Sequence, residues 1–376
     1  MKPNNISQKN QHSLAVLRFL AQNGPSTQIL VTLAGQLKRT SVFNLFEDMA
    51  AAGLLELNEN IPAVSGKGRP RQLWTLRPGL GCFFSVYVNK HIRGYALSDF
   101  AGRQLAAGVE NSSHAGLETE LDWIHALLRK WHRRYRIAGV MLIIPGRVDF
   151  EHGFVHVSRS WGLEKAALRD MLRAKLADIA PDALFVIENN ARMCTWGQRY
   201  GGVCTGLKDY MALMFVDGLR EEPRMPIGIG SGMVLNGSLF RGHSGGAGEL
   251  DRECYRWYEK LYQGKNYPVS LLELDHGTRR SFARSLGESF AHLVNYLEPQ
   301  RLAVVFEQSP AVDFFYVLRE ELYGNLLYID PKQFSIEISS DGINSTVRGG
   351  QALLKSLFWE DDARLLQYLQ ECLPCV

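Results

Sequence analysis

The apolar residues near the start of the chain recur at helical spacing. Leu14, Leu17 and Ala21 fall three or four positions apart and share one helical face. The segment Asn23-Gly24-Pro25 follows them, and glycine and proline end helices. The pattern therefore predicts a first helix over residues 13–21.

A second, shorter helix is predicted directly afterwards. Ser26 and Thr27 suit its N-terminus, because their side-chain oxygens accept hydrogen bonds from free backbone N–H groups. The apolar residues Ile29, Leu30 and Leu33 follow within two turns. We expect these three side chains to be buried.

A third helix, over residues 40–52, has the clearest periodicity. Its apolar residues Val42, Leu45, Phe46 and Met49 stand at i, i+3, i+4 and i+7, and therefore share one face. Polar residues occupy most of the remaining positions. This helix is therefore predicted to have a buried face and a face turned toward solvent or a partner.

Two predicted strands, at residues 54–57 and 72–76, flank a basic turn at 66–71. Three helices followed by such a hairpin are typical of a winged helix-turn-helix, whose third helix reads base edges in the major groove. We therefore predict a DNA-binding domain over residues 1–77. Base contacts are expected from Arg39, Thr40, Ser41 and Asn44, and phosphate or minor-groove contacts from Lys67, Arg69 and Arg71.

The charge distribution favours this interpretation. The whole chain carries a net charge of only +3, but residues 1–75 hold eight lysines and arginines against four aspartates and glutamates. A local positive excess attracts a polyanion such as DNA. The alternative is that the three helices form a dimerisation or packing module and the basic turn is a solvated loop.

From residue 78 onward, predicted strands alternate with predicted helices, which is typical of an α/β fold with two successive sheets and a cleft between two lobes. The expected strands are residues 83–88, 94–99, 137–145, 183–188, 210–216, 302–306 and 334–339. The expected helices are residues 118–135, 163–178, 277–297 and 349–371.

A glycine-rich segment at residues 226–242 is the most informative part of this second region. Its alternating glycines allow close approach of a bound group, and Asn236-Gly237 predicts a tight turn between two strands. The segment Gly245-Gly246-Ala247-Gly248-Glu249 follows at once. The pattern predicts a hairpin and loop that border a ligand site.

These motifs resemble the ROK family (repressor, open reading frame, kinase). The resemblance rests on three segments that occur in the order seen in the family: Pro145-Gly146, residues 188–191 and residues 228–249. In addition, Gly68-Arg69-Pro70 is similar to the wing of the family's transcriptional regulators, such as the xylose and N-acetylglucosamine repressors. It implies an actin-like, hexokinase-like ATPase fold over residues 78–376, with lobes at about 78–190 and 191–376, and a response to sugars.

The chain departs from the pattern of the family's kinases at three places. Asn190 stands where the kinases have the aspartate that accepts the proton of the sugar hydroxyl, and a carboxamide has no basic lone pair for that proton. Residues 87–91 lack the glycines of the phosphate loop, and only Cys254 remains near the usual zinc site. We therefore expect no catalytic residue, no cofactor and no metal.

The residues that remain in the expected cleft can pair with sugar hydroxyls. By this resemblance the effector site would contain Asn189, Asn190, Gly230 and Glu249, with Trp161 stacked on the sugar. The alternative is that the asparagines form a polar strand end, Trp161 belongs to the core, and Glu249 caps a helix.

The sequence predicts a cytoplasmic DNA-binding transcriptional regulator, a repressor, whose kinase-like body senses a sugar or sugar derivative. No leader peptide or membrane-length apolar run is found. The expected partners are an operator duplex and a second copy, in a homodimer or homotetramer. An active sugar kinase with an accessory DNA-binding domain, and an effector-independent DNA-binding protein, remain as alternatives.

Overall fold

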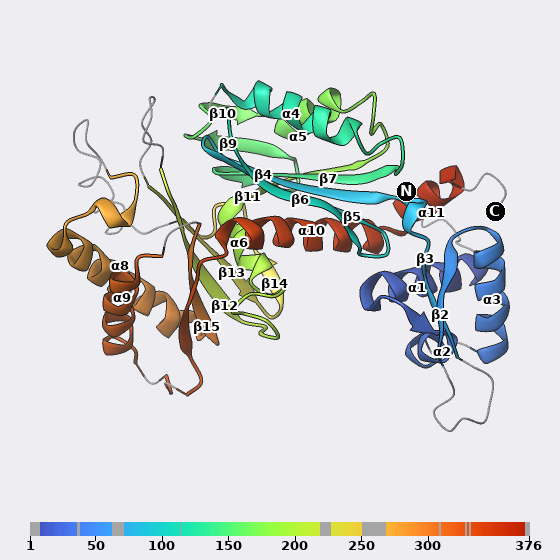
Figure 1. Ribbon diagram of the computed structural model, residues 1–376. Coiled ribbons are helices and arrows are strands. Elements are labelled where there is room, and N and C mark those ends of the chain that lie inside the picture. Colours follow the sequence, from blue (N-terminus) through green and yellow to red (C-terminus); the bar gives the residue numbers. More distant parts are fainter. Residues whose placement is uncertain are drawn as a thin grey trace.

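The computed structural model describes residues 8–35, 38–61, 71–113, 115–218, 227–249, 268–307, 310–327, 329–330 and 332–372. An N-terminal unit lies beside a larger body, and the body contains two five-stranded sheets (Figure 1). None of the helices in these ranges is both long enough and apolar enough to cross a bilayer.

The N-terminal unit contains helices and a small antiparallel sheet with strand order β1-β3-β2. Its elements are α1 (Gln8–Asn23), β1 (Ser26–Thr27), α2 (Gln28–Gly35), α3 (Arg39–Ala51), β2 (Leu55–Ile61) and β3 (Arg71–Leu76). The predicted apolar face of α3 is confirmed, because Val42, Leu45, Phe46 and Met49 are all buried. Strands β2 and β3 pair where the sequence predicts a hairpin.

The prediction for α2 is wrong. Ile29, Leu30 and Leu33 are 40%, 52% and 72% exposed, and Val31 is the buried residue of this helix. An α-helix turns by about 100° per residue, so residues two positions before and after Val31 lie on the opposite face. Once Val31 contacts the core, Ile29 and Leu33 must therefore point outward.

The first lobe is built on a sheet with strand order β11-β7-β4-β5-β6. Its strands are β4 (Cys82–Val88), β5 (Ile92–Asp99), β6 (Gln104–Asn111), β7 (Ile137–Ile144) and β11 (Leu184–Asn189). Strands β7 and β11 continue the sheet in parallel with β4, and β4, β5 and β6 are antiparallel. Helices α4 (Leu117–Arg129) and α5 (Leu168–Lys175) cover one face of the sheet (Figure 1).

A small second sheet at the edge of this lobe contains β8 (Arg147–Asp149), β9 (Phe154–Ser158) and β10 (Leu163–Ala166). The helix expected over residues 163–178 is therefore only partly present. Gly162 has a φ of 62° and turns the chain back, so that Leu163 pairs with Ser158 and the first part of the segment extends as β10. Helix α5 begins after this pairing ends.

The second lobe contains a sheet with strand order β14-β13-β12-β15-β16. Its strands are β12 (Tyr210–Val216), β13 (Gly228–Leu235), β14 (Ser238–Phe240), β15 (Arg301–Phe306) and β16 (Ser335–Ser339). The predicted hairpin is confirmed, since Asn236 and Gly237 have φ values of 51° and 74° between β13 and β14. Helices α8 (His276–Leu297) and α9 (Val312–Gly324) pack on the outer face of this sheet (Figure 1). Helix α9 was not expected from the sequence.

Two helices, α6 (Asn190–Gly197) and α10 (Gly342–Glu360), cross between the lobes. The two helix backbones touch at Gly349 of α10 and Gly197 of α6, where only glycine leaves enough room. A Cβ added to Gly349 would stand 2.0 Å from the Met193 carbonyl oxygen, and a Cβ added to Gly197 would stand 1.7 Å from the Ser345 carbonyl oxygen. Helix α10 also contacts β4, β5 and β7 of the first sheet. It therefore packs on both sides of the lobe boundary expected at residue 190.

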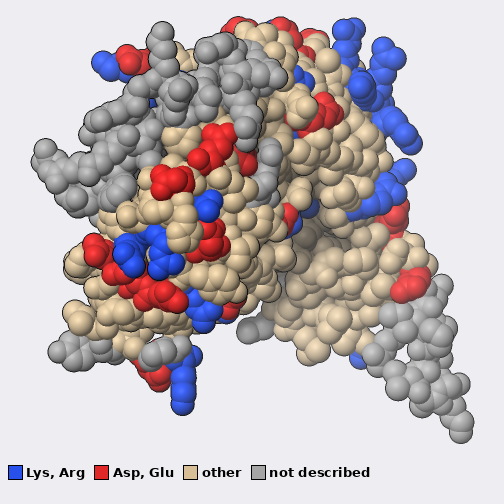
Figure 2. Space-filling view, turned by 60° about the vertical axis from the view of Figure 1, so that its left-hand side comes forward, with Lys and Arg blue, Asp and Glu red and all other residues tan. Residues whose placement is uncertain are grey.

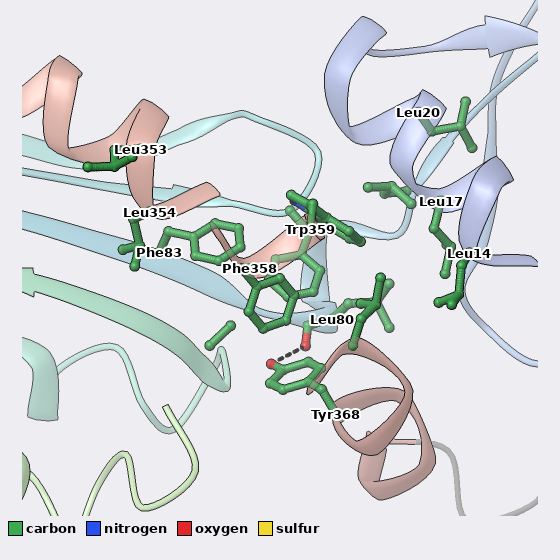
Figure 3. Packing of buried hydrophobic residues seen from close by; sticks show 14 of the residues in the cluster. Leu14, Leu17, Leu20, Leu80, Phe83, Leu353, Leu354, Phe358, Trp359 and Tyr368 are labelled. Carbon is green, nitrogen blue, oxygen red and sulfur yellow. Dashed lines mark hydrogen bonds between the residues drawn. The ribbon is translucent and has the colours of Figure 1, made fainter. Parts of the chain in front are cut away.

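The C-terminal helices join the body to the N-terminal unit. The expected helix over 349–371 is interrupted at Asp361, after which α11 (Asp362–Cys372) begins. Phe358 and Trp359 at the end of α10, and Tyr368 in α11, lie between the first sheet and α1 (Figure 3). The Tyr368 hydroxyl donates a hydrogen bond to the Leu80 carbonyl at 3.0 Å.

One continuous apolar cluster results from this arrangement. Leu14, Leu17 and Leu20 of α1 belong to the same cluster as Phe358 and Trp359 of α10 (Figure 3). The Arg18 guanidinium also donates hydrogen bonds to the Trp359 carbonyl and the Asp362 carboxylate. The N-terminal unit is therefore packed firmly on the body.

The surface of the second lobe carries both signs of charge. On the face turned forward in Figure 2, Lys and Arg side chains are intermingled with Asp and Glu side chains. Mixed charges of this kind produce no strong field of one sign. This face of the second lobe therefore offers no continuous basic surface to a polyanion.

Candidate functional site

A cavity of about 420 Å³ lies between the two large sheets. Strand ends and turns from both lobes line it, which is where ligands bind in open α/β sheets. Four of the expected effector residues line this cavity: Asn189, Asn190, Gly230 and Glu249. A volume of this order accommodates a monosaccharide with a substituent.

Asn189 is largely occupied by structural hydrogen bonds. Its side-chain oxygen accepts from the Arg192 backbone N–H at 3.0 Å, as the N-cap of α6, and its amide donates to the Gly146 carbonyl at 2.8 Å. It therefore joins the ends of β7 and β11 at the floor of the cavity. Asn190 is 7% exposed; its side-chain oxygen accepts from the Asn189 amide at 3.3 Å, and its own amide lies 3.9 Å from the Met214 sulfur and within hydrogen-bonding reach of the Tyr87 hydroxyl.

Glycines in β13 allow α6 to lie against this strand. A Cβ added to Gly230 would stand 2.9 Å from the Ala191 Cβ, and one added to Gly232 would stand 2.4 Å from the Thr195 Oγ1. Both glycines belong to the β12–β13 ladder, so their backbone is extended. The alternating glycines were expected to allow close approach of a ligand. Close packing of β13 on α6 is a second physical reason for glycine at these positions.

A buried ion-pair network holds the loop that ends at Glu249. Glu188 is fully buried and accepts hydrogen bonds from Arg192 Nε at 2.8 Å and Arg241 Nε at 2.7 Å. Arg192 also donates to the carbonyls of Val148 and Gly245 at 2.9 and 2.7 Å. These contacts fix the loop against β8 and leave Glu249 exposed at the cavity rim.

Trp161 does not line the cavity. Its side chain is 8% exposed and belongs to the apolar cluster of the first lobe, together with Leu121 and Ile124 of α4. An indole in this position contributes to packing and cannot stack on a ligand between the lobes. The structure therefore places Trp161 where the alternative interpretation expects it, in the core.

A buried polar cluster joins the two lobes beside the cavity. The Tyr87 hydroxyl donates to Glu307 Oε1 at 2.8 Å, the Asn89 amide donates to the same oxygen at 3.1 Å, and His91 Nε2 lies 3.1 Å from Glu307 Oε2. Burial, and then the nearby Glu307 carboxylate, raises the pKa of the Tyr87 hydroxyl well above its usual value. Tyr87 therefore keeps its proton and remains a donor at neutral pH.

This cluster involves the two segments that correspond, by resemblance, to the phosphate loop and the adenosine segment of the kinases. Asn89 and His91 follow β4 in the first lobe, and Glu307 follows β15 in the second. The internal carboxylate of Glu307 thus meets the segment that would otherwise approach the phosphates of a nucleotide.

Several cationic residues of the cavity wall were not among those expected from the sequence. Lys90, Arg147 and Arg159 line the cavity with Arg192. Lys90 was considered only as a replacement for a phosphate-loop glycine, and Arg147 directly follows the Pro145-Gly146 motif. The sequence did contain one signal that Arg147 belongs to the cavity wall. Arg147 directly follows Pro145-Gly146, and a residue next to a cavity-lining turn lies close to the same cavity.

The predicted DNA-contacting residues fall into two groups. Arg39, Thr40, Ser41 and Asn44 are exposed in the first turns of α3; by helical spacing Thr40 and Asn44 lie opposite its buried residues, and Arg39 and Ser41 lie at the two flanks of the buried face. Lys67 and Arg69 lie outside the described residues, and Arg71 begins β3, where only its backbone is described. The candidate base contacts thus occupy the exposed N-terminal part of α3, and their role stays a prediction.

No protein-family model matches the chain. Among curated proteins, it is 23% identical over 255 residues to the DNA-binding transcriptional dual regulator NagC of Escherichia coli K12, an alignment that covers 64% of this chain and 57% of that relative. It is 20% identical over 419 residues to the DNA-binding transcriptional repressor Mlc of the same organism, over 97% and 98% of the two chains. The xylose repressor of Caldicellulosiruptor bescii is 22% identical over 64% of this chain.

Solved structures show the same similarity at the level of the fold. A ROK family transcriptional regulator described as a homologue of E. coli Mlc superposes with a TM-score of 0.67 over 96% of this chain and 99% of its own, at 16% identity. The ROK hexokinase of Thermus thermophilus superposes with a TM-score of 0.56 over 74% of this chain.

The comparisons confirm the resemblance to ROK transcriptional regulators that the motifs predict. The fold is α/β, with a body like those of ROK kinases. The NagC alignment spans little more than half of that relative's length, whereas Mlc and the Mlc homologue match along nearly the entire chain. The matches that extend along the full chain are regulators rather than kinases.

Proposed function

We propose that this protein is a DNA-binding transcriptional regulator, a repressor, whose N-terminal unit is a winged helix-turn-helix and whose kinase-like body senses a sugar or sugar derivative. The observation that carries the proposal is the exposed, polar first part of α3 on a unit that shares one apolar cluster with the body. The similarity to NagC, Mlc and the xylose repressor supports it.

Base contacts are assigned to Arg39, Thr40, Ser41 and Asn44. The N-terminal residues of a recognition helix reach base edges in the major groove, and these residues occupy that part of α3. Phosphate contacts are assigned to Lys67, Arg69 and Arg71 of the hairpin turn, because cationic side chains there would follow the backbone beside the groove.

The body is proposed to bind its effector without phosphorylating it. Asn190 lines the cavity where a kinase needs a carboxylate base, and Glu307 already accepts hydrogen bonds from Tyr87 and Asn89. Asn190, Glu249 and the backbone near Gly230 supply polar groups for sugar hydroxyls. No cofactor is needed for this function.

The proposed regulation is a shift between two arrangements of the lobes. A bound sugar favours the arrangement in which two N-terminal units of a homodimer or homotetramer no longer match the spacing of the operator half-sites. Helix α10 is placed to transmit such a shift, since one end packs on α6 beside the cavity and the other end packs on α1.

Selection of bound duplexes from a random pool, followed by fluorescence anisotropy, tests the DNA-binding part. We expect an enriched duplex to bind at least 10³-fold more tightly than unselected duplexes at physiological salt. Arg39→Glu should remove most of this preference, while Arg173→Glu on the exposed side of α5 should leave it unchanged. Failure to enrich any sequence, with weak binding even at low salt, would contradict the proposal.

The second candidate is an active sugar kinase with an accessory DNA-binding unit. The body superposes on a ROK hexokinase over 74% of this chain, which is the observation in favour of a kinase. Release of ADP from ATP in the presence of a panel of hexoses distinguishes the two. We expect no sugar-dependent ADP release, and turnover with any hexose would instead establish the kinase.

A further inference from the structure

The wall of the cavity carries an excess of positive charge. Among the described residues that line it, Lys90, Arg147, Arg159 and Arg192 are cationic, against the carboxylates of Asp217 and Glu249. A recess with low-dielectric walls concentrates the field of such side chains and raises the local concentration of anions. An uncharged sugar can use these side chains only as hydrogen-bond donors, whereas an anion also gains from their charge.

The residues directly behind the wall leave this excess unchanged, because the charges of Glu188 and Arg241 cancel and Arg192 is already counted in the wall. Glu188 is shared between two guanidinium groups, those of Arg192 and Arg241, so a single negative charge faces two positive charges. Arg241 Nη2 is buried and has no hydrogen-bond partner within the described part of the chain. The internal carboxylate therefore cannot neutralise the cationic side of the cavity.

Two of the arginines, Arg147 and Arg159, come from the small sheet and from the turn that follows its strand β9. Arg147 of β8 pairs directly with Val157 of β9, and residues that face each other across an antiparallel pair point to the same side. Arg159 follows the end of β9 at Ser158, in the turn that leads to β10, where its carbonyl accepts a hydrogen bond from the Gly162 backbone N–H. All three residues line the cavity, so this side of the sheet faces it.

The Arg147 guanidinium has one N–H group that is not used in a hydrogen bond to the described residues. Its Nη2 donates to the Ser244 Oγ at 2.7 Å, but its Nε is buried and has no acceptor among the described residues. A buried N–H without an acceptor is unfavourable. An anionic oxygen held in the cavity beside Arg147 would supply an acceptor, and a guanidinium binds carboxylate and phosphate groups through two parallel hydrogen bonds.

We propose that the effector is an anionic sugar, one that carries a phosphate or carboxylate group, and that Arg147 and Arg159 bind this group while Asn190 and Glu249 contact the hydroxyls. The inference rests on the proposed sugar-sensing function of the same cavity and narrows its ligand. The carboxylates of Asp217 and Glu249 would repel an anion placed next to them, which directs the charged group to the β8–β9 side.

Isothermal titration of the full-length protein tests the inference. The probes are glucose, mannose and galactose, each as the neutral sugar, the 6-phosphate and the uronic acid, with inorganic phosphate alone. We expect at least one anionic form to bind tenfold or more tightly than its neutral parent and more tightly than inorganic phosphate. The phosphate and uronate arms identify which anionic group the site accepts.

Variants then locate the anion. Arg147→Gln and, independently, Arg159→Gln should each reduce affinity for the anionic sugar by at least tenfold and change affinity for its neutral parent by less than twofold. Arg173→Gln, an exposed arginine of the same lobe, should change neither. Thermal melting of each variant checks that the fold is retained, and either of the two cavity variants suffices if the other fails to fold.

The outcomes separate this inference from the function on which it rests. If neutral sugars bind as tightly as their anionic forms, or if both cavity variants keep the preference, the anionic effector is overturned and sugar sensing stands. If inorganic phosphate binds as tightly as every sugar phosphate, the site is a general anion site and the inference fails. If no probe binds while the enriched duplex still does, both the inference and the sugar-sensing part of the proposed function fail.

Discussion

The Tyr87 hydroxyl and the Glu307 carboxylate form a 2.8 Å hydrogen bond across the two lobes. Tyr87 belongs to β4 in the first sheet, and Glu307 directly follows β15 in the second. The Glu307 side chain is fully buried, so this bond and those from Asn89 and His91 replace the water that an ionised carboxylate requires. The relative position of the lobes depends on these contacts.

The first prediction concerns this junction. Glu307→Gln should lower the free energy of unfolding by about 1–3 kcal/mol, because the charged acceptor of three donors becomes a neutral amide with one acceptor oxygen. Urea unfolding followed by tryptophan fluorescence measures the change. Glu320→Gln, at an exposed position of α9 in the same lobe, is the matched control and should change stability by less than about 0.5 kcal/mol. Equal effects of the two variants would show that Glu307 does not hold the lobes together.

The second prediction concerns the network below the cavity. Arg192→Ala removes one of the two cationic partners of the fully buried Glu188, and should lower the free energy of unfolding by about 3–5 kcal/mol, since the remaining carboxylate keeps only the Arg241 guanidinium and the Asn189 backbone N–H. Arg173→Ala breaks the exposed pair with Asp170 and should cost at most about 1 kcal/mol. Chemical denaturation of both variants gives the comparison. A cost for Arg192→Ala no larger than that for Arg173→Ala would contradict the network's structural role.

The third prediction follows from a buried thiol. Burial raises the pKa of the Cys194 thiol from 9.0 to about 12. The folded chain keeps this proton while the unfolded chain loses it, so the free energy of unfolding falls as pH rises through the window between these values. One such group contributes a slope of at most about 1.4 kcal/mol per pH unit.

Unfolding measured at a series of alkaline pH values tests this contribution. Cys194→Ala should show a shallower decline with pH than the unmodified chain. Val186→Ala, a buried truncation that removes no titratable group, should lower stability without changing the slope. Parallel declines for the unmodified chain and Cys194→Ala would show that this thiol does not contribute.

The fourth prediction addresses the contact between the N-terminal unit and the body. Arg18 donates to the Trp359 carbonyl and to Asp362, and therefore bridges α1 to the junction of α10 and α11. Arg18→Ala should reduce the coupling free energy between effector and DNA by about 0.5–2 kcal/mol and leave effector affinity within twofold. Titrating DNA with and without effector gives the coupling, and Arg319→Ala in α9 is the control. An unchanged coupling in Arg18→Ala would exclude this contact from the regulatory path.

The elements that the sequence predicted well have strong local signals. The hairpin at Asn236-Gly237 follows from residues that accept positive φ, and β12 at Tyr210–Val216 follows from an uninterrupted apolar run. The burial of α2 was predicted wrongly because apolar residues occur on more than one of its faces, and only contact with α1 and α3 decides that Val31 points inward.

In the candidate site, too, residues in local motifs could be predicted from the sequence, whereas contacts between distant segments could not. Asn189, Asn190, Gly230 and Glu249 could be found because they belong to contiguous motifs. The pairing of Tyr87 with Glu307 joins residues 220 positions apart, and the positions of Arg147 and Arg159 depend on the register of β8 with β9. Neither relationship leaves a periodic or local pattern in the chain, so sequence reasoning had no signal for them.

The effect of a bound sugar on operator affinity tests the central claim most directly. Fluorescence anisotropy of the enriched duplex should be measured with the cavity empty and with it saturated by the tightest sugar found by titration. We expect saturation with the sugar to weaken DNA binding by about 5- to 150-fold, and DNA to weaken sugar binding by the same factor. An operator affinity that stays unchanged while the cavity is demonstrably full would contradict it.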